Sequence, residues 1–265
     1  MGSLIDRTRL ADQLRALGIA PGGIVLVHCS LRRVGPVQGG PVTLLEAIAD
    51  VLGEGGTIVV PSQTPGNSLT SRAFRTATQG LSESERDRYR AAMPGFDPRS
   101  TPSQGMGAFA EAVRLHPAAR RSAHPQTSFA AVGAAAERVA GVHDLDCHLG
   151  ERSPLGTLYR LGATILMIGV GMEKCTALHL GEYRLSGPPP IMTFSCFVIE
   201  NGRRRLREFD APGLDDSDFP VVGDDLLAQP WACRGRLGST SVDALPLIAA
   251  VDHATMWFEK NRGRQ

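Results

Sequence analysis

The spacing of apolar residues changes along the first third of the chain, and each change predicts a different element. Apolar residues recur at helical spacing near the start, which predicts an amphipathic helix that ends at Gly18. The run GIVLVH (residues 23–28) and the run TIVVPS (57–62) are short and almost wholly apolar, as buried strands are. Between them, PVTLLEAIADVLGEGG (41–56) has a helical period, with Thr43 and Glu46 at capping-box spacing. Strand, helix and strand in this order predict a βαβ unit with parallel strands.

The apolar period disappears between residues 63 and 103. This stretch is polar, with clusters of arginine and glutamate followed by prolines, and only residues 83–93 have the composition of a short helix. Long irregular excursions in compact domains are often functional, so we expect a surface segment that flanks a substrate.

Regular patterns return in the remainder of the chain and predict a second set of elements. Helices are expected at residues 105–117, 134–141 and 243–260, and strands at 128–133, 162–169 and 233–242. Residues 191–210 alternate between apolar and polar around Asn201-Gly202, which is the strongest short-range signal for a β-hairpin. The prediction is one α/β domain over residues 1–265, in which a central mixed or parallel sheet has flanking helices. An antiparallel portion at 191–240 is appended to it on the substrate side.

Composition narrows the classes of function without choosing one. The chain has 265 residues, 42% of them hydrophobic, and a net charge of +1 from 28 basic and 27 acidic residues. Such a balance gives no reason to expect nucleic acid or a membrane as a partner. The five cysteines are scattered without a C-x-x-C pair, so neither a disulfide framework nor a cysteine-rich zinc site is indicated. We therefore expect a cytoplasmic protein.

Two glycine patterns resemble dinucleotide motifs but lack their context. GVGMEK (169–174) has Lys174 where the third glycine belongs, and GMGAFA (105–110) follows TPSQ where a strand is required. A third stretch, VHCSLRRVGPVQGG (27–40), leaves a predicted strand and enters a predicted helix through glycines. Backbone N–H groups at such an entrance can hold a phosphate group, and an ordinary strand-to-helix loop is the alternative.

His179 and Glu182 form the best candidate for acid–base chemistry. They lie in TALHLGEYR (176–184), just beyond the predicted strand 162–169, and three residues apart on a helix they share one face. A carboxylate at this distance can hold one ring nitrogen and leave the other free to accept a proton. A histidine and a carboxylate at this spacing are also part of many metal sites, so a metal-dependent hydrolase stays open as an alternative.

The other histidines carry weaker signals. His143 and His148 flank DLDC and lack a second ligand pair at suitable spacing, so no metal site is predicted there. His124, in RSAHPQTSF, precedes a predicted strand, where a functional and a structural role are equally compatible with the pattern.

Several stretches together resemble one family. VLVHCSLRRVGPVQGG, GTIVVPSQT, FDPRSTPSQGMGAFAEAVRLHPAARRSAHPQTSFAAVG and SPLGTLYRLGATILMIGVGMEKCTALHLGEYR are similar, in order and spacing, to the aminoglycoside 3-N-acetyltransferases. The resemblance covers about residues 5–260. It implies transfer of acetyl from acetyl-CoA to the 3-amino group of a 2-deoxystreptamine ring, and a fold distinct from the common GNAT acetyltransferases.

The resemblance also assigns roles to residues of this chain. His179 is implied as the general base and Glu182 as its orienting or substrate-binding carboxylate, with no metal required. The implied coenzyme A contacts are Ser30, Leu31, Val34, Gly35, Val37, Thr101, Ser103 and Phe129. A polycationic sugar needs carboxylates, and the predicted acceptor contacts are Asp97, His124, Asp215 and Asp216.

Three alternatives remain open from sequence. An acyl-cysteine on Cys175 would give a two-step transfer, whereas direct attack of the amine needs no thiol. The same fold can act on another amine in a biosynthetic pathway in place of conferring antibiotic resistance, and a non-catalytic binding protein is the third reading. The final helix is compatible with a monomer or a homodimer.

Overall fold

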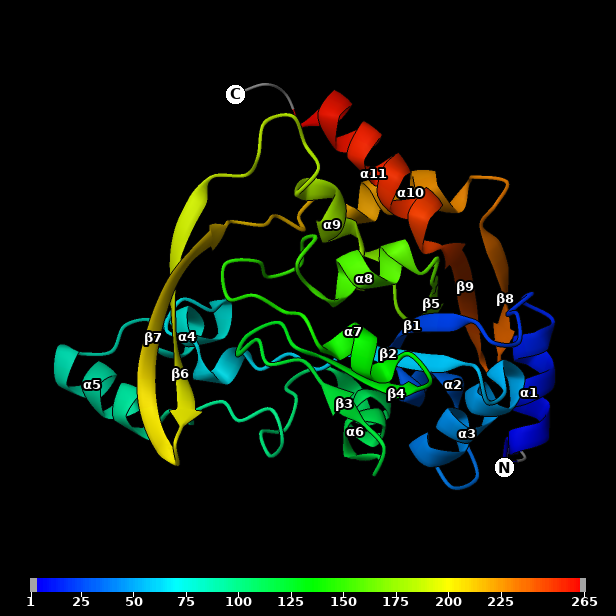
Figure 1. Ribbon diagram of the computed structural model, residues 1–265, viewed down its shortest axis with the longest axis horizontal. Helices are drawn as coiled ribbons and strands as arrows, with labels where there is room; N and C mark the ends of the chain where they lie inside the picture. Colours follow the sequence, from blue (N-terminus) through cyan, green and yellow to red (C-terminus); the bar gives the residue numbers. More distant parts are fainter. Residues whose placement is uncertain (1–3, 263–265) are drawn as a thin grey trace.

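A seven-stranded sheet forms the centre of the protein, whose structure, a computed structural model, describes residues 4–262 (Figure 1). Its strands are ordered β3-β4-β2-β1-β5-β9-β8. Their bounds are β1 (Ile24–Cys29), β2 (Thr57–Pro61), β3 (Arg120–Arg121), β4 (Phe129–Gly133), β5 (Thr164–Ile168), β8 (Cys233–Leu237) and β9 (Thr240–Pro246). The central strands β2, β1 and β5 are parallel, β4 and β9 are antiparallel to them, and the edge strands β3 and β8 are antiparallel to β4 and β9, respectively. The predicted mixed sheet is therefore confirmed, including the β1–β2 crossover.

Helices cover both faces of this sheet. One face is covered by α1 (Arg7–Arg15), α3 (Pro41–Leu52) and α6 (Gly107–Leu115), and the other by α7 (Ala136–Ala140), α8 (Pro154–Arg160), α9 (Leu178–Glu182), α10 (Phe219–Leu227) and α11 (Leu247–Asn261). In Figure 1, α8 to α11 lie above the sheet, and α1, α3 and α6 lie below and beside it. Within β1, Val25 and Val27 pack in the core on the side of α1, α3 and α6, whereas Leu26 packs in the core on the side of α7 to α11. Burial on both faces explains why these strands are continuous apolar runs.

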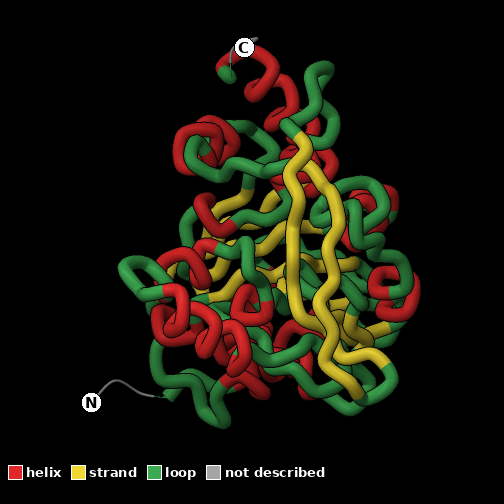
Figure 2. Tube along the Cα trace, turned by 90° about the vertical axis from the view of Figure 1, so that its left-hand side faces the viewer, coloured by secondary structure: helices red, strands yellow, loops and turns green. Residues whose placement is uncertain are grey.

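The chain between 191 and 212 forms a hairpin that stands apart from the main sheet. Strands β6 (Ile191–Glu200) and β7 (Arg203–Pro212) pair along their whole length, and Figure 2 shows them in front of the body. Asn201 (φ 50°) and Gly202 (φ 72°) both adopt the left-handed backbone that a two-residue turn requires. The predicted hairpin is confirmed.

The polar excursion packs beside this hairpin. It contains a short 3₁₀ turn, η1 (Pro65–Asn67), and two helices, α4 (Arg72–Ala77) and α5 (Glu83–Ala92), where one helix was predicted. Isolated bridges join Ser68 to Cys196 and Phe96 to Val198, and Phe96, Cys196 and Val198 form a small core with Phe209. Two segments that are about a hundred residues apart in sequence therefore form one lobe.

The C-terminal prediction was partly wrong. Residues 243–246, assigned to the final helix, belong to β9, and the predicted strand 233–242 is a hairpin of β8 and β9 that turns at Gly238 (φ 58°). Helix α11 begins only after Pro246. Proline has no backbone N–H, so it cannot donate a hydrogen bond within a sheet or in the interior of a helix. Region 191–240 is consequently divided between the two sheets. No helix within residues 4–262 is both long and apolar enough to cross a membrane.

Capping also differed from the prediction. Helix α3 starts at Pro41 after Gly40, so Thr43 and Glu46 lie inside its first turns, and Glu46 bonds Arg7 of α1. A true capping box occurs at α5, where Ser82 and Glu85 bond each other's backbone N–H groups. The spacing alone does not distinguish the two sites, because proline at the first helical position fixes the start of α3 instead.

Candidate active site

A cavity of about 610 Å³ lies at the carboxyl ends of the parallel strands. Its walls come from the end of β1 and the following loop with helix α2 (Leu31–Val34), from the start of α6, and from the loop after β5 with the 3₁₀ turn η2 (Met172–Lys174). His179 of α9 and Asp216 also line it. In open α/β sheets, ligands bind outside the carboxyl ends of strands where the chain order changes direction, as it does between β2, β1 and β5.

His179 is held in this cavity by a carboxylate one turn away. Its Nδ1 atom lies 2.5 Å from Oε2 of Glu182, and the side chains are 14% and 1% exposed, respectively. The ring also packs against Phe219, with centroids 4.7 Å apart. An ionised carboxylate only accepts hydrogen bonds, so Nδ1 carries the proton and Nε2 is left with a lone pair. The pair therefore has the arrangement of an oriented general base.

Glu182 is anchored from two further directions. Its Oε1 atom accepts from the backbone N–H of Asp215 (2.9 Å) and from Nη1 of Arg262 (2.5 Å). Both carboxylate oxygens of Glu182 are thus hydrogen-bonded within the protein, which suits an orienting role better than substrate binding. Arg262 was not predictable from the sequence as part of the site, because it lies 80 residues from Glu182 and no local pattern links them.

His28 is a second imidazole on the cavity wall. It ends β1, and its Nε2 lies 3.3 Å from the hydroxyl of Thr176. Burial lowers the pKa of His28 to about 4. It is therefore uncharged at neutral pH and can orient Thr176 without adding charge to the site.

The predicted coenzyme A contacts fall into two groups. Ser30 and Leu31 line the cavity. Val34 has no exposed surface, Gly35 adopts φ 103° close to Ser239, and Val37 pairs with Ile5. These three residues contact other parts of the protein and do not line the cavity, so their contact with a cofactor stays a prediction.

The other residues predicted to contact coenzyme A do not line the cavity. Thr101 Oγ1 accepts from the backbone N–H of Asp97, and Ser103 donates its hydroxyl to Glu111 at 2.5 Å. Phe129 is fully buried in the core. The Ser103 hydroxyl is thus already committed to Glu111.

The predicted acceptor contacts are also dispersed. Asp216 lines the cavity with His179, whereas Asp215 accepts from the N–H of Ser217, a bond that lowers the pKa of the Asp215 carboxyl. Asp97 accepts from the N–H of Arg99 in its own turn. His124 has no exposed surface. Of these four, Asp216 is the residue that lines the cavity with His179.

His124 belongs to a cluster of three imidazoles beneath the hairpin. Its ring centroid is 4.6 Å from those of both His143 and His148, and Phe194 and Phe209 of the hairpin complete the group. Burial lowers the pKa of His143 and of His148 to about 4, and that of His124 well below its usual value. Within residues 4–262, no three histidine, cysteine, aspartate or glutamate side chains are arranged to hold a metal ion.

The cysteines near the site are poor nucleophiles. Burial raises the pKa of both Cys29 and Cys175 to about 12, and Cys175 has no exposed surface. The thiolate is the reactive form, so an acyl-cysteine intermediate at Cys175 is disfavoured.

One segment that the sequence analysis set aside forms part of the cavity. Residues 105–110, the GMGAFA stretch, line it at the start of α6, with Gly105 and Gly107 at φ 75° and 85°. An ideal Cβ at Gly107 would lie 3.4 Å from the carbonyl oxygen of Cys29. The absence of a preceding strand correctly excludes a dinucleotide motif, but the paired glycines before a helix marked a close backbone approach.

Comparison with known proteins identifies the family. The family model described as aminoglycoside 3-N-acetyltransferase matches residues 26–259. The chain belongs to the aminoglycoside 3-N-acetyltransferase family. The acetyl-CoA-dependent transferase class predicted from the sequence is confirmed at this level.

Individual relatives of this acetyltransferase match nearly all of its residues. It is 35% identical to the aminoglycoside N(3')-acetyltransferase-like protein YokD of Bacillus subtilis, with 95% of this chain and 92% of the relative covered. The crystal structure of YokD superposes with a TM-score of 0.92 over 100% of this chain and 97% of YokD. Aminoglycoside N(3)-acetyltransferase VII of Streptomyces paromomycinus is 32% identical, with 98% and 94% covered. AAC-IIIb, solved as a binary complex with CoASH, has a TM-score of 0.83 at 28% identity, with 97% of both chains covered.

Proposed function

We propose that this protein transfers the acetyl group of acetyl-CoA directly to the 3-amino group of a 2-deoxystreptamine aminoglycoside, and thereby confers antibiotic resistance. The observation that carries the mechanism is the 2.5 Å contact between His179 Nδ1 and the buried Glu182 carboxylate at the wall of the cavity. It leaves Nε2 as a proton acceptor on a side chain that lines the cavity.

The reaction follows from this geometry. An ammonium has no lone pair, so the acceptor reacts as the free amine, and Nε2 of His179 removes a proton as nitrogen attacks the thioester carbonyl carbon. The C–N bond forms, the tetrahedral intermediate collapses, and the C–S bond breaks. The imidazolium then returns its proton to the departing CoA thiolate, which gives CoASH and the N-acetyl product. Glu182 stabilises the transient imidazolium.

The donor end of the cavity is formed by the loop after β1 and the start of α6. Ser30, Leu31 and Gly107 are its small and apolar components, and Arg32 and Lys174 add positive charge. Narrow glycine turns suit a pantetheine arm, and the two cations suit the phosphates of CoA. The CoASH complex of the related AAC-IIIb supports a donor site in this fold.

The acceptor end is assigned to the side of Asp216. This carboxylate lines the cavity together with His179 and is therefore placed to meet an ammonium group of the sugar next to the reacting amine. Asp215 supports the same loop through its backbone contact with Glu182.

The test is thiol release from acetyl-CoA in the presence of gentamicin, sisomicin, kanamycin, apramycin or a simple diamine, with NMR of the product to locate the acetyl group. We expect release of CoASH, a singly acetylated product and modification of the 3-amino group. Gentamicin already acetylated at that amine is the matched control and is expected to be inert.

Two results would contradict the proposal. Turnover of the blocked gentamicin would place the reaction at another amine. Turnover of the diamine alone, without any aminoglycoside, would indicate a different acceptor class. Expression in a susceptible host should raise the inhibitory concentration of the accepted drugs, and a His179→Ala variant should not.

A further inference from the structure

Arg262, which follows α11, makes an unusual number of contacts next to the proposed base. Its Nη1 donates to Glu182 (2.5 Å), its Nε and Nη2 to the two oxygens of Asp218 (2.7 and 2.6 Å), and its Nη2 also to the carbonyl oxygen of Asp215 (2.8 Å). The guanidinium lies 3.8 Å from the ring centroid of Phe258. The side chain is only 20% exposed.

These contacts join three parts of the site. Glu182 belongs to α9, Arg262 follows α11, and Asp215 and Asp218 lie in the loop before α10, the loop that also presents Asp216 to the cavity. A planar guanidinium can bond two carboxylates and a carbonyl together, whereas an ammonium is a point charge. Arg262 therefore fixes the position of the Glu182 carboxylate and of the acidic loop by one group.

Arg262 also stabilises the negative charge of Glu182. This carboxylate is 1% exposed, so it requires a cation or several donors to remain ionised. The charged and titratable groups around the dyad are His148, Tyr183, Asp215, Asp216, Asp218 and Arg262. Among them, Arg262 is the cation in direct contact with Glu182.

We propose that Arg262 is a positioning residue for acetyl transfer, which holds Glu182 ionised against His179 and fixes the Asp215–Asp218 loop at the acceptor side. The inference rests on the proposed function in taking His179 as the base. Because Arg262 and a protonated His179 compete for one carboxylate, Arg262 keeps the imidazole free to accept a proton. Without it, Glu182 stabilises the imidazolium alone, and the dyad stays protonated to higher pH.

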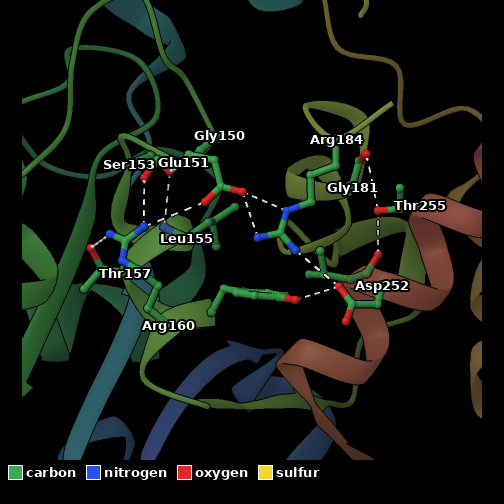
Figure 3. Close-up of polar contacts among 12 residues, drawn as sticks. Gly150, Glu151, Ser153, Leu155, Thr157, Arg160, Gly181, Arg184, Asp252 and Thr255 are labelled. Atoms are coloured by element: carbon green, nitrogen blue, oxygen red, sulfur yellow. Dashed lines mark hydrogen bonds and ion pairs between the residues drawn. The ribbon is translucent and has the colours of Figure 1, made fainter. Parts of the chain in front are cut away.

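Arg184, which follows α9, provides a matched control. It bonds Glu151 (2.7 Å) and Asp252 of α11 (3.2 Å), and its guanidinium lies 3.7 Å from the ring centroid of Tyr159. Its side chain is 22% exposed, nearly the same as that of Arg262. Figure 3 shows Arg184 between Glu151 and Asp252. Both arginines thus connect to α11 and to an aromatic ring, but only Arg262 bonds Glu182.

The experiment compares Arg262→Met, Arg262→Lys and Arg184→Met with the unmodified enzyme in pH profiles of kcat/KM. For Arg262→Met we expect the acidic limb to move up by about one pH unit and kcat at neutral pH to fall roughly tenfold, with KM for acetyl-CoA unchanged. We expect Arg262→Lys to return the acidic limb of the profile to its normal pH. KM for the aminoglycoside should remain about threefold or more above normal, because an ammonium holds the Asp215–Asp218 loop less firmly than a guanidinium does. Arg184→Met is expected to lose stability and keep its pH profile.

A second readout does not depend on turnover. The His179 imidazole of ¹⁵N-histidine-labelled protein, assigned by its absence in His179→Gln, is titrated by NMR without substrates in the same variants. An upward shift in Arg262→Met alone supports the inference even if no aminoglycoside is acetylated. Identical titrations in Arg262→Met and Arg184→Met would overturn it, whatever the outcome for the proposed function.

Discussion

Two imidazole sites of this protein differ chiefly in what their rings bond. His179 bonds a carboxylate, Glu182, at the wall of the large cavity. In the cluster beneath the hairpin, His124 donates to the carbonyl of Leu145 and His143 to the carbonyl of His148. Their other ring nitrogens accept from backbone N–H groups and hydroxyls.

The difference shows why burial alone does not make a base. In His124 and His143, neutral partners on both nitrogens fix one tautomer and provide nothing to stabilise a proton, and Nε2 of His148 is buried without a partner among the described residues. The cluster therefore stays uncharged and serves to pack the hairpin against the body. A carboxylate on one nitrogen leaves the other free and stabilises the charge once a proton arrives. The first arrangement suits structure and the second suits catalysis.

The largest effect is expected from His179→Ala. Loss of the proposed base should lower kcat by about 10²–10⁴-fold, because positioned general bases contribute factors of this size. Acetyl-CoA binding, measured by calorimetry, should be nearly unchanged. A variant that retains the kcat of the unmodified enzyme would show that His179 is not the base.

Glu182→Gln tests the tautomer. The amide oxygen would take the side of the two donors, Arg262 and the Asp215 N–H, and its NH₂ group would face Nδ1 of His179. The proton would then move to Nε2, which can no longer accept one, and kcat should fall by roughly 10²–10⁴-fold with little loss of fold. Circular dichroism checks the fold. A small kinetic effect together with a normal fold would assign Glu182 to structure alone.

His124→Asn tests the structural site and should act on stability instead. The Asn oxygen can replace Nδ1 as an acceptor, but the carbonyl of Leu145 loses its donor, which costs about 1–3 kcal/mol. We expect urea denaturation to report this loss, and KM for the aminoglycoside to be unchanged. A large rise in that KM would instead support the sequence-based assignment of His124 to the acceptor site.

The last expected effect is a pH dependence of stability. The pKa of His148 is lowered by burial to about 4 from 6.5, so between these values the unfolded chain binds a proton that the folded protein does not. Stability contributed by the neutral ring is complete above pH 6.5 and is lost as pH falls toward 4, by at most about 1.4 kcal/mol per pH unit. His148→Phe, which suits the aromatic surroundings, should flatten this slope in urea denaturation. An unchanged slope would mean that another group titrates.

Much of the fold followed from the sequence, because local periods and turn residues act over a few positions. The apolar runs of β1, β2 and β5, the helical period of α3, and Asn201-Gly202 between β6 and β7 each depend on neighbours within the same element. His179 and Glu182 were also predictable as a pair, since a spacing of three on a helix brings them together wherever the helix lies.

The remainder was decided by contacts between distant segments. The period of a strand does not give its direction, so the antiparallel flanks of the sheet were not predictable from β4 or β9 alone. Arg262 meets Glu182 across 80 residues, Asp216 reaches the cavity while Asp97 does not, and residues 105–110 complete its wall. Sequence determines which side chains can do chemistry, and packing determines which of them meet, because a contact between remote residues depends on how every element between them is placed.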